Sequence, residues 1–186
     1  CDWYLELSKL RLKPDSAGPS PVPVLVHVLE ASLRLLHPFM PFITEELWQQ
    51  LKHNLPDNQL KAESIMVSTY PEANGARIDE EAEALVETLI DIIRSIRNIR
   101  AEHSVDLNHM IKTEVFCGDR SSELQIYSRV IEFMTKAKPV FAHTRNRTTG
   151  SDETVIVLKN AEIVIPLKSL IDIDKERARL TKEVTA

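Results

Sequence analysis

Three arginines follow one another at intervals of three residues, as Arg94, Arg97 and Arg100, in a segment that also contains Asn98. On a helix, each step of three residues turns the side chain by about 300°, so the three side chains shift gradually around the cylinder. We expect Arg94 opposite the apolar stripe, Arg97 on one flank and Arg100 near the core edge. Guanidinium groups bind phosphates and stack on bases, and an asparagine can read a base edge. These four residues are therefore candidate RNA contacts.

The same arginines also have an ordinary structural interpretation. A helix C-terminus favours positive charge because of the helix dipole, so the spacing alone does not decide between the two. A second, weaker candidate is the polar loop at residues 145–152, in which Arg145 and Arg147 flank Asn146. Mixed polar loops usually contact nothing specific, so this interpretation is open as well.

The residue types that catalysis and metal binding need do not occur at the required spacings. The four glycines, at positions 18, 75, 118 and 150, are too far apart for a dinucleotide-binding turn or a phosphate-binding loop. Cys1 and Cys117 cannot form a C-x-x-C site, and no two of the six histidines are four residues apart. We therefore expect no catalytic residue, no metal and no cofactor in this chain. His27 and His37 are interpreted as hydrogen-bonded core or capping groups.

Composition narrows the class of protein further. The chain has 186 residues and a formal charge of −5, which argues against binding nucleic acid through bulk positive charge but not against a local basic patch. With 43% hydrophobic residues it is globular. The longest uncharged run, residues 16–29, contains three prolines, so we expect no membrane-spanning helix. No secretory signal is present and cysteines are few, which predicts a cytoplasmic protein. The first residue is not Met, which is typical of a piece of a longer chain.

Hydrophobic periodicity predicts helices in the first part of the chain. The end of a helix at residues 3–12 is followed by a linker rich in proline at 13–23. Residues 24–37 are apolar on most sides, which predicts a mostly buried helix, and Pro41 opens the next one. Residues 53–76 are a connection, with 65–67 extended. The clearest helix is at 78–103, where apolar residues recur in steps of four and three.

After residue 106 the period changes to that of a mixed α+β unit. Strands are predicted at 110–117 and 140–142, a helix at 121–136, and a hairpin from 155–158 and 162–165. A charged helix at 173–186 has the character of a coiled-coil arm. The predicted fold is mainly α: a helical bundle at 1–105, a small α+β domain at 106–172 and the start of a coiled coil at 173–186.

Several segments resemble a known family. Residues 36–48 read Leu-His-Pro-Phe-Met-Pro-Phe-Ile-Thr-Glu-Glu-Leu-Trp, which resembles the signature of the anticodon-binding domain of class I aminoacyl-tRNA synthetases for valine, isoleucine and leucine. The opening Cys-Asp-Trp-Tyr-Leu-Glu fits the same domain. Three further segments are similar to the valyl-tRNA synthetase branch: 64–71, the Ile-Arg-Asn-Ile-Arg-Ala-Glu of 96–102, and 165–180. The resemblance covers essentially the whole chain.

The resemblance implies a role in a larger enzyme. Such an enzyme joins valine to its tRNA with ATP and Mg in a catalytic domain and removes mischarged product in an editing domain. Its H-I-G-H and K-M-S-K-S signatures do not occur in this sequence. The implied role of this chain is to hold the anticodon stem-loop of tRNA(Val), with the catalytic and editing domains of the same polypeptide as partners and no membrane. An isoleucine or leucine enzyme, or a protein-interaction scaffold with the same fold, are the alternatives.

The resemblance also implies an apolar neighbour for residues 24–36. The family's domain begins with an earlier helix of W-N-A-x-R-F character, and that pattern does not occur here. We therefore expect a partly exposed apolar groove along this segment.

Overall fold

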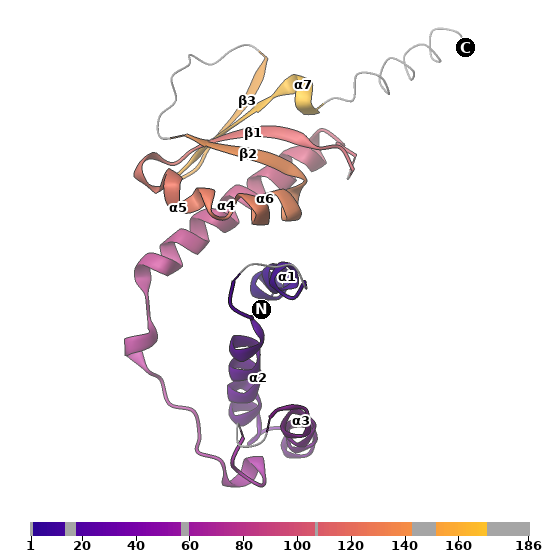
Figure 1. The fold of residues 1–186 in the computed structure, drawn as a ribbon, viewed down its shortest axis with the longest axis vertical. Helices are drawn as coiled ribbons and strands as arrows, with labels where there is room; N and C mark the ends of the chain where they lie inside the picture. The colour runs from indigo at the N-terminus through magenta and orange to yellow at the C-terminus, as the bar shows by residue number, and fades with distance from the viewer. Residues whose placement is uncertain (1, 14–17, 57–59, 107, 143–151, 171–186) are drawn as a thin grey trace, which may run out of the picture. The chain divides into compact units, whose positions relative to one another are not determined.

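The computed structural model describes residues 2–13, 18–56, 60–106, 108–142 and 152–170 (Figure 1). The chain divides into two compact units, one of residues 1–78 and one of residues 79–186. The division falls after Ile78 and not near residue 106, where the change of sequence period suggested it. The long helix therefore belongs to the same compact unit as the sheet. Among the described residues, no helix is long and apolar enough to cross a membrane.

The first unit is made of helices and short turns. Its α-helices are α1 (Asp2–Arg11), α2 (Val22–Leu36) and α3 (Pro41–Asn54), and its 3-10 helices are η1 (Ile65–Val67) and η2 (Gly75–Arg77). Proline stands in the first turn of both α2 and α3, where its missing N–H costs nothing, so the prediction that Pro41 opens a helix is confirmed. The core is small and consists of Leu33, Trp48 and Ile65, with Leu60 and Ala62 against it.

Most of α2 is more exposed than its sequence predicts. Leu33 is its one buried residue, whereas Val28, Leu29 and Leu36 are 49%, 47% and 47% exposed. The prediction of a mostly buried helix at 24–37 is therefore wrong for this chain, because α3 and the 60–65 segment cover only one side of α2. The expectation of exposed apolar surface along this segment is confirmed.

Residues 65–67 form a turn of 3-10 helix and not the extended segment predicted for them. Ser64 Oγ accepts a hydrogen bond from the Met66 N–H at 3.1 Å and so caps this turn. Glu45 Oε2 accepts from Ser64 Oγ at 2.8 Å and from the Ile65 N–H at 3.1 Å. A carboxylate on α3 thus stabilises the turn, and local β propensity gives way to this tertiary contact.

The second unit is a four-stranded mixed sheet with its longer helices on one face (Figure 1). The strands β1 (Ile111–Phe116), β2 (Ala137–Ala142), β3 (Glu153–Val157) and β4 (Glu162–Pro166) lie in the order β2-β1-β4-β3. Strand β1 pairs parallel with β2 and antiparallel with β4, and β3 pairs with β4 as the predicted hairpin. The helices are α4 (Glu80–Glu102), η3 (Gly118–Arg120), α5 (Ser121–Gln125), α6 (Ser128–Thr135) and α7 (Leu167–Leu170).

The apolar stripe of α4 is buried in this unit. Ile92, Ile93 and Ile96 are 0% exposed, as are Ile111 and Val115 on the alternating inner positions of β1. The predicted single helix at 121–136 is instead two helices, α5 and α6. The N–H groups of Ile126 and Tyr127 bond carbonyls three residues back, which interrupts the α-helical ladder between them. Residues 145–151 of the loop predicted at 145–152, and the whole of the coiled-coil helix predicted at 173–186, lie outside the described residues.

Candidate nucleic-acid interface

The exposed surface of the last turns of α4 carries three of the predicted contact residues. Arg94, Arg97 and Asn98 are all exposed, and their spacing of three and four residues puts them on one helix face. We call these three residues the basic end of α4. The exposed charged residues of the preceding turns are acidic and include Glu83, Glu87 and Asp91. Positive charge on α4 is therefore confined to its C-terminal part, where the helix dipole also favours it.

The side chain of Arg97 is held in place from a neighbouring helix. Its Nε donates a hydrogen bond to the backbone carbonyl of Met134 on α6 at 3.0 Å. This bond uses one of the five N–H donors of the guanidinium, and the side chain remains exposed to solvent. A phosphate in front of Arg97 would therefore meet a donor whose orientation is already fixed, which lowers the entropy cost of binding.

Arg100 lies in a different environment from Arg94 and Arg97. It is 6% exposed, and its guanidinium donates to three backbone carbonyls. Nη1 bonds the oxygens of His109 at 2.9 Å and Lys136 at 3.3 Å, and Nη2 bonds that of Asp106 at 2.5 Å. Burial lowers the pKa of Arg100, and the nearby Asp106 carboxylate partly offsets this. Arg100 thus stabilises the fold at the end of α4.

The chain turns back sharply at this point. Ser104 has a φ of 50°, the left-handed conformation that ends a helix, and the Val105 N–H bonds the Arg100 carbonyl at 2.9 Å. The returning backbone brings the Asp106 and His109 carbonyls to the guanidinium. His109 in turn donates from Nε2 to the Ser169 carbonyl at 2.9 Å. Arg100 and His109 therefore join α4, the segment that leads into β1, and α7.

Lys136 is a cation near this site that the sequence analysis missed. It is exposed, it follows Met134 by two residues, and its own carbonyl accepts the bond from Arg100. It is 36 residues from Arg100 in sequence, so no local spacing could connect the two. The other predicted pair, Arg145 and Arg147, lies outside the described residues, so the structure adds nothing about it.

The polar residues of the 36–48 motif act within the fold. His37 Nδ1 donates to Thr44 Oγ1 at 2.8 Å, because the single hydroxyl proton of Thr44 is used toward the Met40 carbonyl at 2.8 Å. These bonds close the turn between α2 and α3, as expected for His37 as a capping group. Trp48 is 2% exposed and packs in the core, whereas Phe39 and Phe42 are 81% and 91% exposed.

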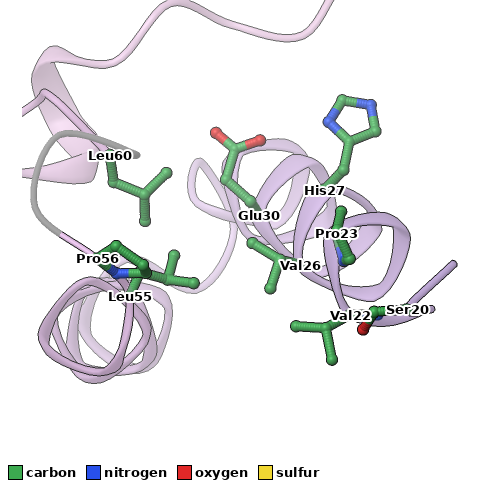
Figure 2. A pocket seen from close by; sticks show the side chains of 9 residues that line it. All are labelled: Ser20, Val22, Pro23, Val26, His27, Glu30, Leu55, Pro56 and Leu60. Carbon is green, nitrogen blue, oxygen red and sulfur yellow. The ribbon is translucent and has the colours of Figure 1, made fainter. Parts of the chain in front are cut away.

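A groove of about 650 Å³ lies between the start of α2 and the chain after α3 (Figure 2). Its walls are mostly apolar, with Val22 and Val26 on one side and Leu55 and Leu60 on the other, and His27 and Glu30 are its polar residues along α2. This lining offers no pair of groups set for acid–base or nucleophilic chemistry. It is part of the apolar surface of the first unit.

Comparison with known proteins defines the class of this chain. The family model described as the anticodon-binding domain of tRNA ligase matches residues 1–115, which include the 36–48 motif, α4 and most of β1. The chain belongs to this family. The family match extends across the boundary between the two compact units, so it covers more than either unit alone.

Three bacterial relatives of this chain share one name. The chain is 43% identical over 188 residues to a valine–tRNA ligase of Dehalococcoides mccartyi strain CBDB1, covering 100% of this chain and 21% of that protein. It is 38% identical to that of Listeria innocua, over 99% of this chain and 20% of the relative, and 36% identical to that of Bacillus subtilis, over 98% and 20%. The chain thus spans about a fifth of the length of these relatives.

Proposed function

We propose that this chain is the part of a valine–tRNA ligase that binds the anticodon stem-loop of tRNA(Val). The observation that carries the proposal is the coverage: relatives of that name match essentially the whole chain at 36–43% identity. The family to which the chain belongs supports tRNA as the ligand. Single-stranded loop bases and the phosphates around them are the groups that such a domain can read.

The basic end of α4 would supply phosphate contacts in this role. Arg94 and Arg97 would neutralise phosphates, and Asn98 would hydrogen-bond a base edge. Arg100 would act through the backbone that it supports, because it is buried and its guanidinium bonds three carbonyls. Since the whole chain carries a charge of −5, we expect binding to be weak and sensitive to salt.

The chemistry of the ligase would take place elsewhere in the polypeptide. We assign amino-acid activation, with ATP and Mg, and editing to separate catalytic and editing domains, which would be the protein partners of this chain in the cytoplasm. This is supported by the fifth of the relatives' length that the chain spans and by the lack of H-I-G-H and K-M-S-K-S signatures in its sequence. The chain itself would not catalyse a reaction.

Binding of transcripts tests this proposal. The purified chain should bind a valine tRNA transcript more tightly than one with a swapped anticodon, and binding should weaken between about 50 and 200 mM salt. The Arg97→Gln variant should reduce the slope of log K against log salt by about 0.7–0.9, as expected for one lost phosphate contact. The Arg129→Gln variant on the exposed side of α6 serves as the control.

Two outcomes would argue against the proposal. Equal binding to valine, isoleucine and leucine transcripts would contradict the assignment to valine. The alternative of an isoleucine or leucine synthetase would then stand. No binding to any transcript at low salt, by a chain that is folded by circular dichroism, would favour the scaffold alternative.

A further inference from the structure

A second groove, of about 530 Å³, lies along α2 on the side of residues 69–77. We call it the His27–Arg77 groove, after the two residues that meet in it. Its lining also includes Arg34, Tyr70, Glu72 and Asn74. All of these residues belong to the first compact unit, so the groove does not depend on the placement of the second.

Arg34 holds the two walls of this groove together. It forms an ion pair with Glu30 one turn earlier on α2, at 2.7 Å, and its Nη1 donates to the Thr69 carbonyl at 2.5 Å. The segment after Thr69 is thereby tied to α2. Asn74 then caps η2, because its Oδ1 accepts the Ala76 N–H at 3.1 Å, and this cap sets the position from which Arg77 extends. These bonds preorganise the groove in the absence of a ligand.

The contact at the centre of the groove joins Arg77 and His27. Arg77 Nη1 lies 2.9 Å from His27 Nε2. A guanidinium can only donate, so Nε2 must accept, and the imidazole is neutral with its proton on Nδ1. No carboxylate of the described chain lies within 4 Å of the Arg77 guanidinium, whereas Arg34 has Glu30. Within the part of the chain that the structure describes, the charge of Arg77 is thus not paired with a carboxylate, and it lies beside an imidazole that can become a donor.

We propose that this groove binds one nucleotide of single-stranded RNA. The phosphate sits between Arg77 and His27, with the His27 proton moved to Nε2 so that both side chains donate to it. The base stacks on Tyr70, which is 53% exposed and lines the same groove. Of the remaining charged groups that face His27, Arg34 and Glu30 neutralise each other, and Glu72 is the one carboxylate left to oppose the phosphate.

This proposal deepens the proposed function and rests on it, since it names a place where a loop nucleotide of the tRNA is held. His27, Tyr70 and Arg77 would contact the nucleotide, and Asn74 positions Arg77 through its cap of η2. They come from two segments that are up to 50 residues apart, and only the fold brings them together. The basic end of α4 is not part of this groove.

The experiment uses the whole chain and three probes: the valine transcript, a six-uridine RNA and inorganic phosphate. Arg77→Gln should weaken binding of the six-uridine RNA about tenfold and abolish binding of inorganic phosphate. Tyr70→Ala should weaken binding of the RNA several-fold and leave the phosphate response unchanged, because phosphate has no base. In the nitrogen NMR spectrum, His27 Nε2 should change from acceptor to N–H donor when RNA is added. Lys61→Gln, an exposed change in the same unit, is the control.

The outcomes separate this proposal from the function on which it rests. If Arg77→Gln binds the six-uridine RNA as the unchanged chain does and the His27 signal does not move, the groove is not a nucleotide site, even where the transcript preference persists. If the groove binds the six-uridine RNA but no transcript is preferred, the site stands and the tRNA assignment falls. If the groove binds phosphate and Tyr70→Ala leaves the affinity for the six-uridine RNA unchanged, the contact between Tyr70 and a base is wrong.

Discussion

Arg94, Arg97 and Arg100 differ in how the fold surrounds each guanidinium, although they belong to one repeating pattern. Arg97 bonds one carbonyl and stays exposed, and Arg100 bonds three and is buried. A guanidinium whose donors are satisfied inside the fold contributes to stability, whereas one with open donors can meet a phosphate. The same residue type therefore supports two different predictions.

Arg100→Met should destabilise the second unit by about 2–4 kcal/mol, because the carbonyls of residues 106, 109 and 136 lose a charged donor that is itself buried. Urea unfolding followed by far-UV circular dichroism measures this change. Arg129→Met, the same substitution at an exposed position of α6, should change stability by less than about 0.5 kcal/mol. Equal effects of the two variants would contradict the structural role of Arg100.

Glu45 should make the first unit sensitive to acid. Its hydrogen bond from Gln49, together with those from Ser64 and the Ile65 N–H, holds its pKa below the ordinary value of 4.5, although partial burial opposes them. A carboxylate with a lowered pKa in the folded state stabilises the protein above its unfolded pKa, and this contribution is lost as the pH falls below about 4.5.

The Glu45→Gln variant tests this expectation. At neutral pH it should be less stable than the unchanged chain, and the difference in urea midpoint should shrink as the pH is lowered through about 4. Glu46→Gln, on the exposed side of the same turn, should behave like the unchanged chain. A difference that is constant with pH would mean that the Glu45 charge has no role in stability.

At the level of elements, helix α4 explains why the chain divides after Ile78 and not near residue 106 as predicted. Its stripe of apolar residues is long enough to cover a sheet, and Thr88 near its middle accepts a 3.4 Å hydrogen bond from Asn160 in the β3–β4 turn. The sequence alone indicates the stripe but not its partner, because an apolar face packs equally well on helices or on a sheet.

Ile96→Ala should therefore unfold the second unit preferentially. Ile96 is 0% exposed, so its truncation should cost about 2–5 kcal/mol. Amide hydrogen exchange should accelerate in β1 and β4 and stay unchanged in α2 and α3. Val86→Ala, at a position that is 40% exposed, should have a much smaller effect. Faster exchange in α3 with no change in β1 would assign α4 to the first unit.

At the scale of the whole molecule, the first unit combines a small core with several large apolar side chains that are exposed. Leu36, Phe39, Phe42 and Leu47 are all exposed, the two phenylalanines almost fully. Soluble monomers rarely expose contiguous apolar patches of this kind.

The chain in isolation should therefore bind a hydrophobic dye such as ANS, and Phe39→Ser with Phe42→Ser should reduce that fluorescence by roughly half. Stability should fall little, because side chains this exposed bury little area on folding. Dye fluorescence and the urea midpoint of the double variant measure the two effects. Undiminished fluorescence would show that the dye binds elsewhere, such as the groove of Figure 2.

The local elements were largely predictable from the sequence because their signals are local. The 3.6-residue stripe of α4, the proline that opens α3 and the alternation in β1 each depend on neighbouring residues. The segment at 65–67 and the break at Ile126 were not predictable, because a contact from Glu45 and a local change of hydrogen-bond register decide them.

The sequence by itself determined the family, through a motif whose residues are contiguous, and the limits on chemistry, through glycine, cysteine and histidine spacing. Tertiary structure alone decided which cations are open to a ligand. Arg100 is buried because the backbone returns around it, the Lys136 carbonyl meets Arg100 across 36 residues, and His27 meets Arg77 across 50 residues. Whether a side chain is exposed, and which side chains meet, depend on contacts between segments that are distant in sequence. The spacing of residues along the chain does not predict those contacts.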